Sequence, residues 1–308
     1  MSNFAFNNPA FQQQDPRKAA TYPGAPQQAA PQAGTYAPPP APVPTAAQAA
    51  AVNANLEGMY AAPSAGAIET DRMSVEDTVW KTVGLFAILL ATAVVGWVWT
   101  MSSMNPITGD VTLIPWMVGA LGGFVLAMVV TFTSRKKVRP GLIFGYAAFE
   151  GLFVGAISAF FETLWPGIVI QASLATFSVV GVTLALFASG KIRASAKMTK
   201  IVMIAMLGYL VFSVVNLILM WTNVSMAAGP FGLYSQKIAG IPLGLIIGVL
   251  VVFMAAYSLV MDFDQIQQGV RNGAPRKYGW LGGFGIMVTV VWLYVEILRM
   301  IAILRGNN

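Results

Sequence analysis

The sequence predicts an all-α integral membrane protein, a bundle of seven transmembrane helices preceded by a disordered tail. Three observations support this fold class: the composition, a series of long apolar runs, and the distribution of positive charge. Of the 308 residues, 56% are hydrophobic and only 10% are charged, and the mean hydropathy is +0.67. Because soluble domains typically carry about 25% charged residues, this chain is too apolar for a soluble domain.

Residues 1–74 are expected to form a disordered cytoplasmic tail rich in Pro, Ala and Gln, and residues 75–308 the membrane domain. Eleven of the 18 prolines lie before residue 71. Large apolar side chains are too few there to offset the entropy of ordering the chain. The tail lacks the basic and then apolar pattern of a signal peptide, so we expect it to stay in the cytoplasm.

From Val79 onward, apolar runs recur at lengths suited to crossing a membrane. About 20 helical residues cross roughly 30 Å of hydrocarbon. The seven expected spans are residues 79–101, 111–133, 142–162, 167–189, 199–221, 241–268 and 282–304.

The short loops predict the orientation, because Lys and Arg are retained on the cytoplasmic side. The loops after the second, fourth and sixth spans hold 11 of these residues, and the alternating loops hold only Lys237. The basic loops are "SRKKVRP", "KIRASAKMTK" and "RNGAPRK". The amino terminus is therefore expected inside and the carboxyl terminus outside. Arg299 and Arg305 favour the opposite side for that end, which leaves open whether the seventh helix spans fully.

Acidic residues are scarce in the predicted membrane domain, so each one is a candidate for function. The acids after residue 77 are Asp110, Glu150, Glu162, Asp262, Asp264 and Glu296. The chain has no histidine and no cysteine, so a pH response near neutrality would come from carboxylates and disulfides are excluded. Asp262 and Asp264 lie about 200° apart around a helix, so one of them should face inward.

Glu296 lies in the apolar run "WLYVEILRM", and turn-forming residues separate it from Asp262. In an antiparallel hairpin with its midpoint at Gly279, Asp262 and Glu296 would be level, with Asp264 close by. Two carboxylates in a low-dielectric site do not both stay charged, so they would share a proton near neutrality. Ionisable residues inside a membrane are costly and indicate function, which makes this pair a candidate proton or cation switch.

Two structural alternatives remain open for these acids. Asp262 and Asp264 would be an ordinary solvated helix end if they lay in the cytoplasmic head-group region. Arg299, three residues after Glu296, could form an ion pair with it on the same helix.

Residues 75–305 resemble the transmembrane Bax-inhibitor-motif (TMBIM) family in its bacterial branch. The resemblance rests on the seven-helix pattern, on "MDFDQI" at the end of the sixth span, and on "LYVEILRMIAIL" in the seventh. It also rests on "RKKVRPGLIFGYAAFEGLFVGAIS", which is similar to the family's basic loop and the helix that follows it. Together, in this order, these motifs are fairly specific.

The resemblance implies a bundle with the seventh helix in the centre and a pH-sensitive calcium leak across the bacterial plasma (inner) membrane. Asp262 and Glu296 would be the gating acids and bind calcium weakly, and Arg135 would latch the closed state. Two departures matter: the acid of the seventh helix is Glu, and Glu150 adds an acid to the third helix and so to the predicted ion pathway. Calcium is expected only as the transported ion, with no resident cofactor.

Other functional classes are weighed by their motifs. The G-x-G-D loop of intramembrane aspartyl proteases, the H-E-x-x-H zinc motif and the G-x-S-x-G elbow are all absent from the sequence, so we do not expect an enzyme. A proton-coupled transporter remains open, as does a non-conducting regulator that binds membrane proteases or other membrane proteins. The expected partners are the lipid bilayer, calcium ions and protons, with membrane proteins as a further class and no nucleic acid.

Overall fold

The computed structural model describes residues 71–105, 107, 109–222 and 231–306. Most of the predicted tail, residues 1–70, lies outside the described residues. Within the described part, seven helices are long and apolar enough to cross a membrane, which confirms the predicted spans. They are α2 (Val75–Ser102), α3 (Ile114–Ser134), α4 (Pro140–Leu164), α5 (Ile168–Ala188), α6 (Ala196–Trp221), α7 (Leu243–Arg271) and α8 (Tyr278–Gly306).

Local capping explains where two of these helices begin. The Ser74 hydroxyl accepts a hydrogen bond from the Asp77 amide at 3.1 Å, which caps the start of α2. The Glu162 carboxylate accepts the amides of Gly167 at 2.5 Å and Val169 at 3.1 Å. Glu162 therefore caps the amino terminus of α5, where the helix dipole favours a negative charge.

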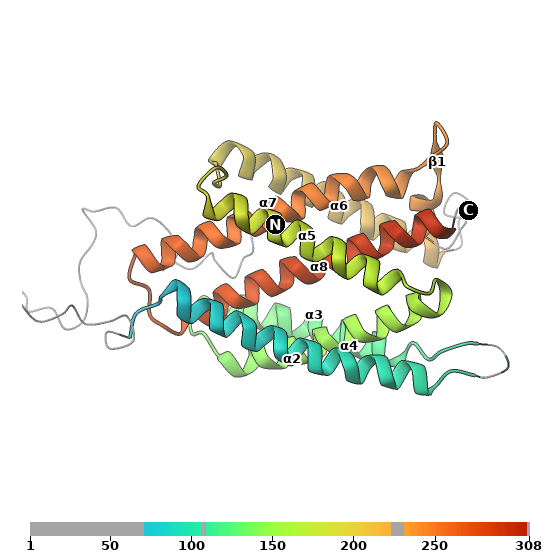
Figure 1. Cartoon of the computed structure of the whole chain (residues 1–308), viewed down its shortest axis with the longest axis horizontal. Coiled ribbons are helices and arrows are strands. Elements are labelled where there is room, and N and C mark those ends of the chain that lie inside the picture. The colour runs from blue at the N-terminus through green and yellow to red at the C-terminus, as the bar shows by residue number, and fades with distance from the viewer. Residues whose placement is uncertain (1–70, 106, 108, 223–230, 307–308) are drawn as a thin grey trace, which may run out of the picture. The chain divides into compact units, whose positions relative to one another are not determined.

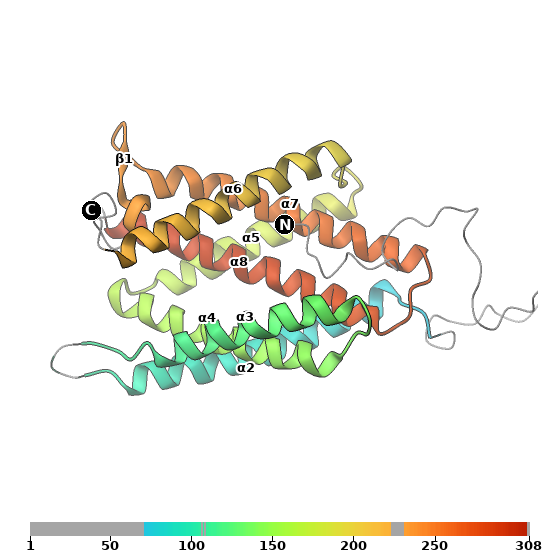
Figure 2. The same cartoon turned by 180° about the vertical axis from the view of Figure 1, so that it is seen from behind.

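Helix α8 lies in the middle of the bundle, as the family resemblance implied. It packs on α7, α2, α5 and α4. In Figure 1 and Figure 2, α2, α3 and α4 lie on one side of it and α5, α6 and α7 on the other. Its 29 residues extend about 44 Å at 1.5 Å per residue, so the seventh helix is long enough to cross the membrane.

Between α6 and α7 the chain forms short elements at one end of the bundle. These are the 3₁₀ helix η4 (Gly232–Ser235) and an antiparallel hairpin of β1 (Lys237–Ile238) and β2 (Ile241–Pro242). The Asn216 side chain of α6 holds this segment, because its Oδ1 accepts the Leu233 amide at 2.6 Å and its Nδ2 donates to the Phe231 carbonyl at 3.3 Å. The buried Asn216 is thus a structural polar residue.

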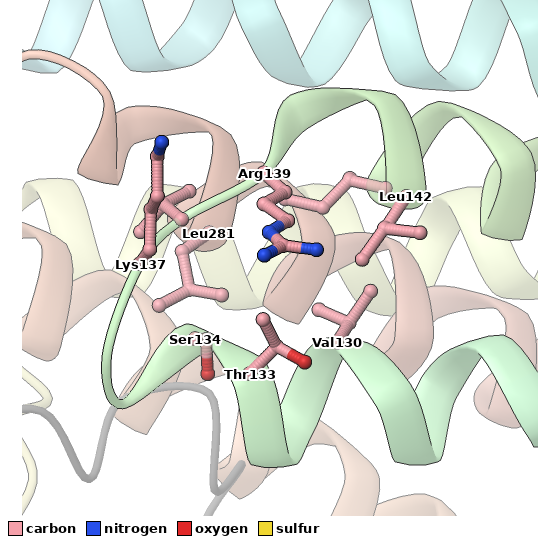
Figure 3. A pocket seen from close by; sticks show the side chains of 9 residues that line it. Val130, Thr133, Ser134, Lys137, Arg139, Leu142 and Leu281 are labelled. Atoms are coloured by element: carbon pink, nitrogen blue, oxygen red, sulfur yellow. The ribbon is translucent and has the colours of Figure 1, made fainter.

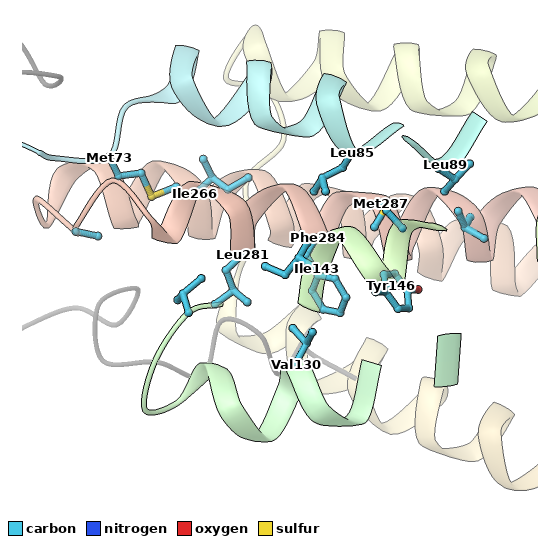
Figure 4. Packing of buried hydrophobic residues seen from close by; sticks show 14 residues of the cluster. Met73, Leu85, Leu89, Val130, Ile143, Tyr146, Ile266, Leu281, Phe284 and Met287 are labelled. Carbon is cyan, nitrogen blue, oxygen red and sulfur yellow. The ribbon is translucent and has the colours of Figure 1, made fainter. Parts of the chain in front are cut away.

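Glycines allow the helices of the first layer to approach closely. A Cβ atom at Gly155 of α4 would collide with the Ala93 carbonyl of α2, and one at Gly119 of α3 would collide with the Phe153 backbone. Small residues have this role at many membrane helix interfaces. The apolar core beside them joins α2, α3 and α4 to α8, and Leu281 of α8 is fully buried in it (Figure 4).

The segment that leads into α2 is fastened to the turn between α7 and α8. The Met73 amide donates to the Ala274 carbonyl at 2.7 Å, and the Met73 side chain is buried. Asp77 forms ion pairs with Lys81 and with Arg276, whose NH2 group lies 2.8 Å from the Asp77 Oδ1 atom. We call Asp77, Lys81 and Arg276 the end clamp, because they join α2 to the α7–α8 turn.

Candidate functional site

Asp262 faces the interior of the bundle from α7, and only 1% of it is exposed. The Thr289 hydroxyl of α8 donates a hydrogen bond of 2.6 Å to the Asp262 Oδ2 atom. Asp264 is only half-buried and accepts a hydrogen bond of 3.0 Å from the Gln268 side chain on its own helix. As the spacing predicted, one of the two aspartates faces inward, and it is Asp262.

The predicted level pairing of Asp262 with Glu296 is wrong in this structure. Asp262 is level with Thr289, which precedes Glu296 by seven residues, or about 10 Å along α8. The α7–α8 turn lies between Arg271 and Tyr278, so the hairpin has its midpoint before Gly279. Gly279 itself lies inside α8 and packs closely on Thr78 of α2. The sequence pattern placed this glycine in the turn, but it forms a contact between two helices.

Glu296 is held in a separate polar cluster between α8 and α6. It is 3% exposed, forms an ion pair with Arg299 on the same helix, and accepts a hydrogen bond of 2.8 Å from the Tyr209 hydroxyl. The Arg299 guanidinium also lies 3.9 Å from the centre of the Tyr234 ring, in cation–π geometry. The intrahelical ion pair that the sequence left open is therefore present. We call Tyr209, Tyr234, Glu296 and Arg299 the α8 ion-pair cluster.

The two buried carboxylates thus occupy two depths of the bundle. On α7, the residue beside the Glu296 carboxylate is Gly248, where an added Cβ would lie 3.4 Å from Oε1. Gly248 precedes Asp262 by 14 residues, about 21 Å along the helix. A calcium ion binds oxygen at about 2.3 to 2.6 Å, so a single ion does not contact both acids in this conformation.

Glu150 and Arg135, the other two predicted site residues, lie elsewhere. Glu150 is half-buried on the side of α4 that faces α3, where its Oε2 lies 3.0 Å from the Cβ position of Gly123. Arg135 is exposed at the carboxyl end of α3, and among the described residues it forms no ion pair. The latch role of Arg135 and the pathway role of Glu150 stay predictions.

The basic loop after α3 nevertheless lies beside the start of α8. Its Val138 is buried in the same core as Leu281. Figure 3 shows Lys137 and Arg139 of this loop around a small cavity that Leu281 also lines. The cavity measures about 10 Å³, which is the size of a single water molecule's site. The loop therefore packs against the start of α8 at this end.

Three residues of the site were not singled out from the sequence: Thr289, Tyr209 and Tyr234. Each of them contacts a charged residue of a different element: Thr289 contacts Asp262, Tyr209 contacts Glu296 and Tyr234 contacts Arg299. Such contacts between elements depend on the register of the helices. The one sequence signal is the placement of Tyr209 within a long apolar run, since a buried tyrosine hydroxyl usually finds a hydrogen-bond partner.

Comparison with known proteins identifies the family but gives no individual relative. No curated protein and no solved structure matched the chain. The family described as Bax inhibitor 1 like matches residues 8–306, nearly the whole chain. This match agrees with the seven membrane-spanning helices, the central α8 and the buried acids at the motif positions in α7 and α8. The chain belongs to the Bax inhibitor 1-like family.

Proposed function

We propose that this protein is a pH-sensitive leak pathway for cations, with calcium as the transported ion, in the bacterial plasma membrane. One observation carries the proposal: two carboxylates, Asp262 and Glu296, are buried at two depths inside a membrane bundle. Burying an ionisable side chain costs about 2.5 to 3.5 kcal/mol on insertion scales. A chain that needed only to fold would gain stability from apolar residues at both positions.

The two acids have different partners, which suggests two gates in series. Thr289, an uncharged donor, holds Asp262 by a hydrogen bond, whereas the cationic Arg299 compensates the charge of Glu296. A cation moving through the bundle would take the place of the Thr289 hydroxyl at the first acid and compete with Arg299 at the second. In the arrangement described here both carboxylates are shielded from solvent.

Protonation acts on both gates, so the leak depends on pH. A proton on Asp262 removes the negative charge that a cation would meet there. A proton on Glu296 also breaks its ion pair with Arg299 and leaves the guanidinium without its counter-charge. In place of the shared proton expected from the sequence, we propose two separate protonation sites, because Thr289, the partner of Asp262, and Glu296 are seven residues apart on α8.

Weak, transient binding of calcium fits these sites better than storage. Calcium prefers six to eight oxygen ligands, and the described residues contain no cluster of three acidic, histidine or cysteine side chains. At each depth the protein would offer one carboxylate and one or two hydroxyl oxygens, with water completing the shell. An ion held this loosely can leave again, as conduction requires.

The experiment is calcium entry into liposomes that contain the purified full chain. A leak predicts calcium entry with no second solute present, and slower entry in the Asp262→Asn and Glu296→Gln variants. Flux that appeared only with a co-transported solute would indicate a coupled transporter instead. No flux above protein-free liposomes, with folded protein verified by its far-ultraviolet circular dichroism, would refute the leak and favour the non-conducting regulator.

A further inference from the structure

An apolar crevice opens on the side of the bundle away from the α8 ion-pair cluster. It has a volume of about 500 Å³ and lies between α2, α4, α5 and α8. Helices α2 and α5 each pack on α8, and the crevice fills the space between them. Its walls are almost entirely apolar, and the Ser158 and Tyr294 hydroxyls there are hydrogen-bonded to each other at 2.7 Å.

The crevice is continuous with the lipid-facing surface. Leu90 and Val94 on α2 are 61% and 62% exposed, and Phe177 on α5 is 68% exposed. All three line the crevice and lie in helices that are long and apolar enough to span the membrane. In a bilayer these side chains meet hydrocarbon rather than water, so whatever enters the crevice comes from the lipid phase.

The dimensions of the crevice match one acyl chain. Along α2 it extends from Phe86 to Trp97, 12 residues whose 11 steps span about 16 Å at 1.5 Å per step. One leaflet of a bilayer contributes about 15 Å of hydrocarbon, half of roughly 30 Å. The volume falls in the range of about 300 to 1,000 Å³ that is typical of ligand pockets. An apolar groove whose length equals the thickness of one leaflet suits an extended acyl chain better than a compact polar ligand.

We propose that one acyl chain of a membrane phospholipid lies in this crevice as a bound lipid. The chain packs on Val290, Val291 and Tyr294 of α8. Tyr294 and Glu296 are two residues apart, about 200° around the helix, so the acyl chain supports α8 on the face opposite Glu296. The bound lipid is thus a structural neighbour of the central helix, and this inference does not depend on ion conduction.

The test uses the full chain in liposomes that contain a phospholipid with a photoreactive diazirine midway along one acyl chain. After illumination, the labelled residues are mapped by peptide mass spectrometry. We expect label to concentrate on the walls of the crevice in α2 and α5, at least threefold above α6. Helix α6 is the internal reference, because its Ile204 is 73% exposed and α6 contributes no residue to this crevice.

A matched pair of variants on α5 separates crevice binding from general lipid contact. Ser173 lines the crevice, whereas Ser178 lies on the same helix, is exposed and does not line it. Ser173→Phe should reduce crevice labelling to the level of α6, and Ser178→Phe should leave it unchanged. Thermal unfolding of both variants checks that they are folded.

Three outcomes would overturn the proposal. Label spread evenly over the lipid-facing helices of the unsubstituted protein would do so without any variant. So would crevice labelling that Ser173→Phe leaves intact while the protein stays folded. In a parallel reaction with a bifunctional protein crosslinker, links between two copies of the chain at crevice residues would identify a second copy of the chain as the occupant.

Discussion

Replacing Arg299 by methionine should destabilise the protein strongly, because it leaves Glu296 charged and buried without its cation. The Arg299 and Glu296 side chains are only 17% and 4% exposed. Removing one partner of a buried ion pair typically costs about 3 to 5 kcal/mol. The substitution also removes the contact with the Tyr234 ring at 3.9 Å, which contributes about 0.5 to 2 kcal/mol.

The same change should be much less costly when Glu296 is already neutral. In the Glu296→Gln background, Arg299→Met loses the ring contact but strands no charge. It also removes the buried Arg299 Nε, which has no hydrogen-bond partner among the described residues. We therefore expect a cost of about 1 to 2 kcal/mol in that background, and a coupling energy between the two sites of about 2 kcal/mol or more.

The assay is a double-mutant cycle on the free energy of unfolding of the detergent-solubilised protein. Unfolding by SDS is followed through the far-ultraviolet circular dichroism of the helices for the unsubstituted chain, both single variants and the double variant. A coupling energy below about 0.5 kcal/mol, the size found for solvent-exposed pairs, would refute the reasoning. It would mean that Glu296 is solvated or protonated in the folded protein.

The remaining predictions concern the ends of the bundle. A chain that starts at Asp71 should keep the thermal stability and calcium flux of the full chain, because the residues before it lack apolar periodicity; a large loss of either would show that the tail is structural. In the end clamp, the coupling of Arg276 to Asp77 should be only about 0.2 to 1 kcal/mol, because Arg276 is 41% exposed and Lys81 also pairs with Asp77; a double-mutant cycle that gave 3 kcal/mol would contradict this. Single cysteines placed at Lys137, Lys191 and Lys277 in the basic loops should not be labelled from outside intact cells, whereas a cysteine at Asp110 at the opposite end should be. Label at any of the three basic loops would show that the predicted orientation is wrong.

The helices could be predicted from the sequence because the membrane leaves the backbone few alternatives. A segment in hydrocarbon must satisfy its own amide and carbonyl groups, so an apolar run of the right length is a helix. That one of Asp262 and Asp264 faces inward was also predictable, since residues two apart cannot share a helix face, but the spacing alone did not say which one. Capping by Glu162 was not, because it depends on how the chain turns at Gly167.

The register between α7 and α8 could not be predicted correctly. Glycine indicates both turns and close helix contacts, and in this chain Gly279, Gly282 and Gly283 are contacts of α8. Interpreting them as a turn moved the hairpin midpoint by several residues and paired Asp262 with Glu296 in place of Thr289. The same limit hid Tyr209, because its partner Glu296 is 87 residues away. Partners across helices follow from packing, which no local pattern encodes.

The most direct test of the central claim is the pH profile of calcium flux in liposomes, measured from about pH 6 to about pH 8. The unsubstituted chain should show flux that changes over this range, and Asp262→Asn should lose part of that change because one of the two protonation sites is gone. Asp264→Asn is the matched control, since this aspartate is half-buried and bonded to Gln268 on its own helix, and it should keep the profile. If Asp262→Asn kept the full pH dependence and Asp264→Asn removed it, the buried acid would not be the sensor and the account would be contradicted.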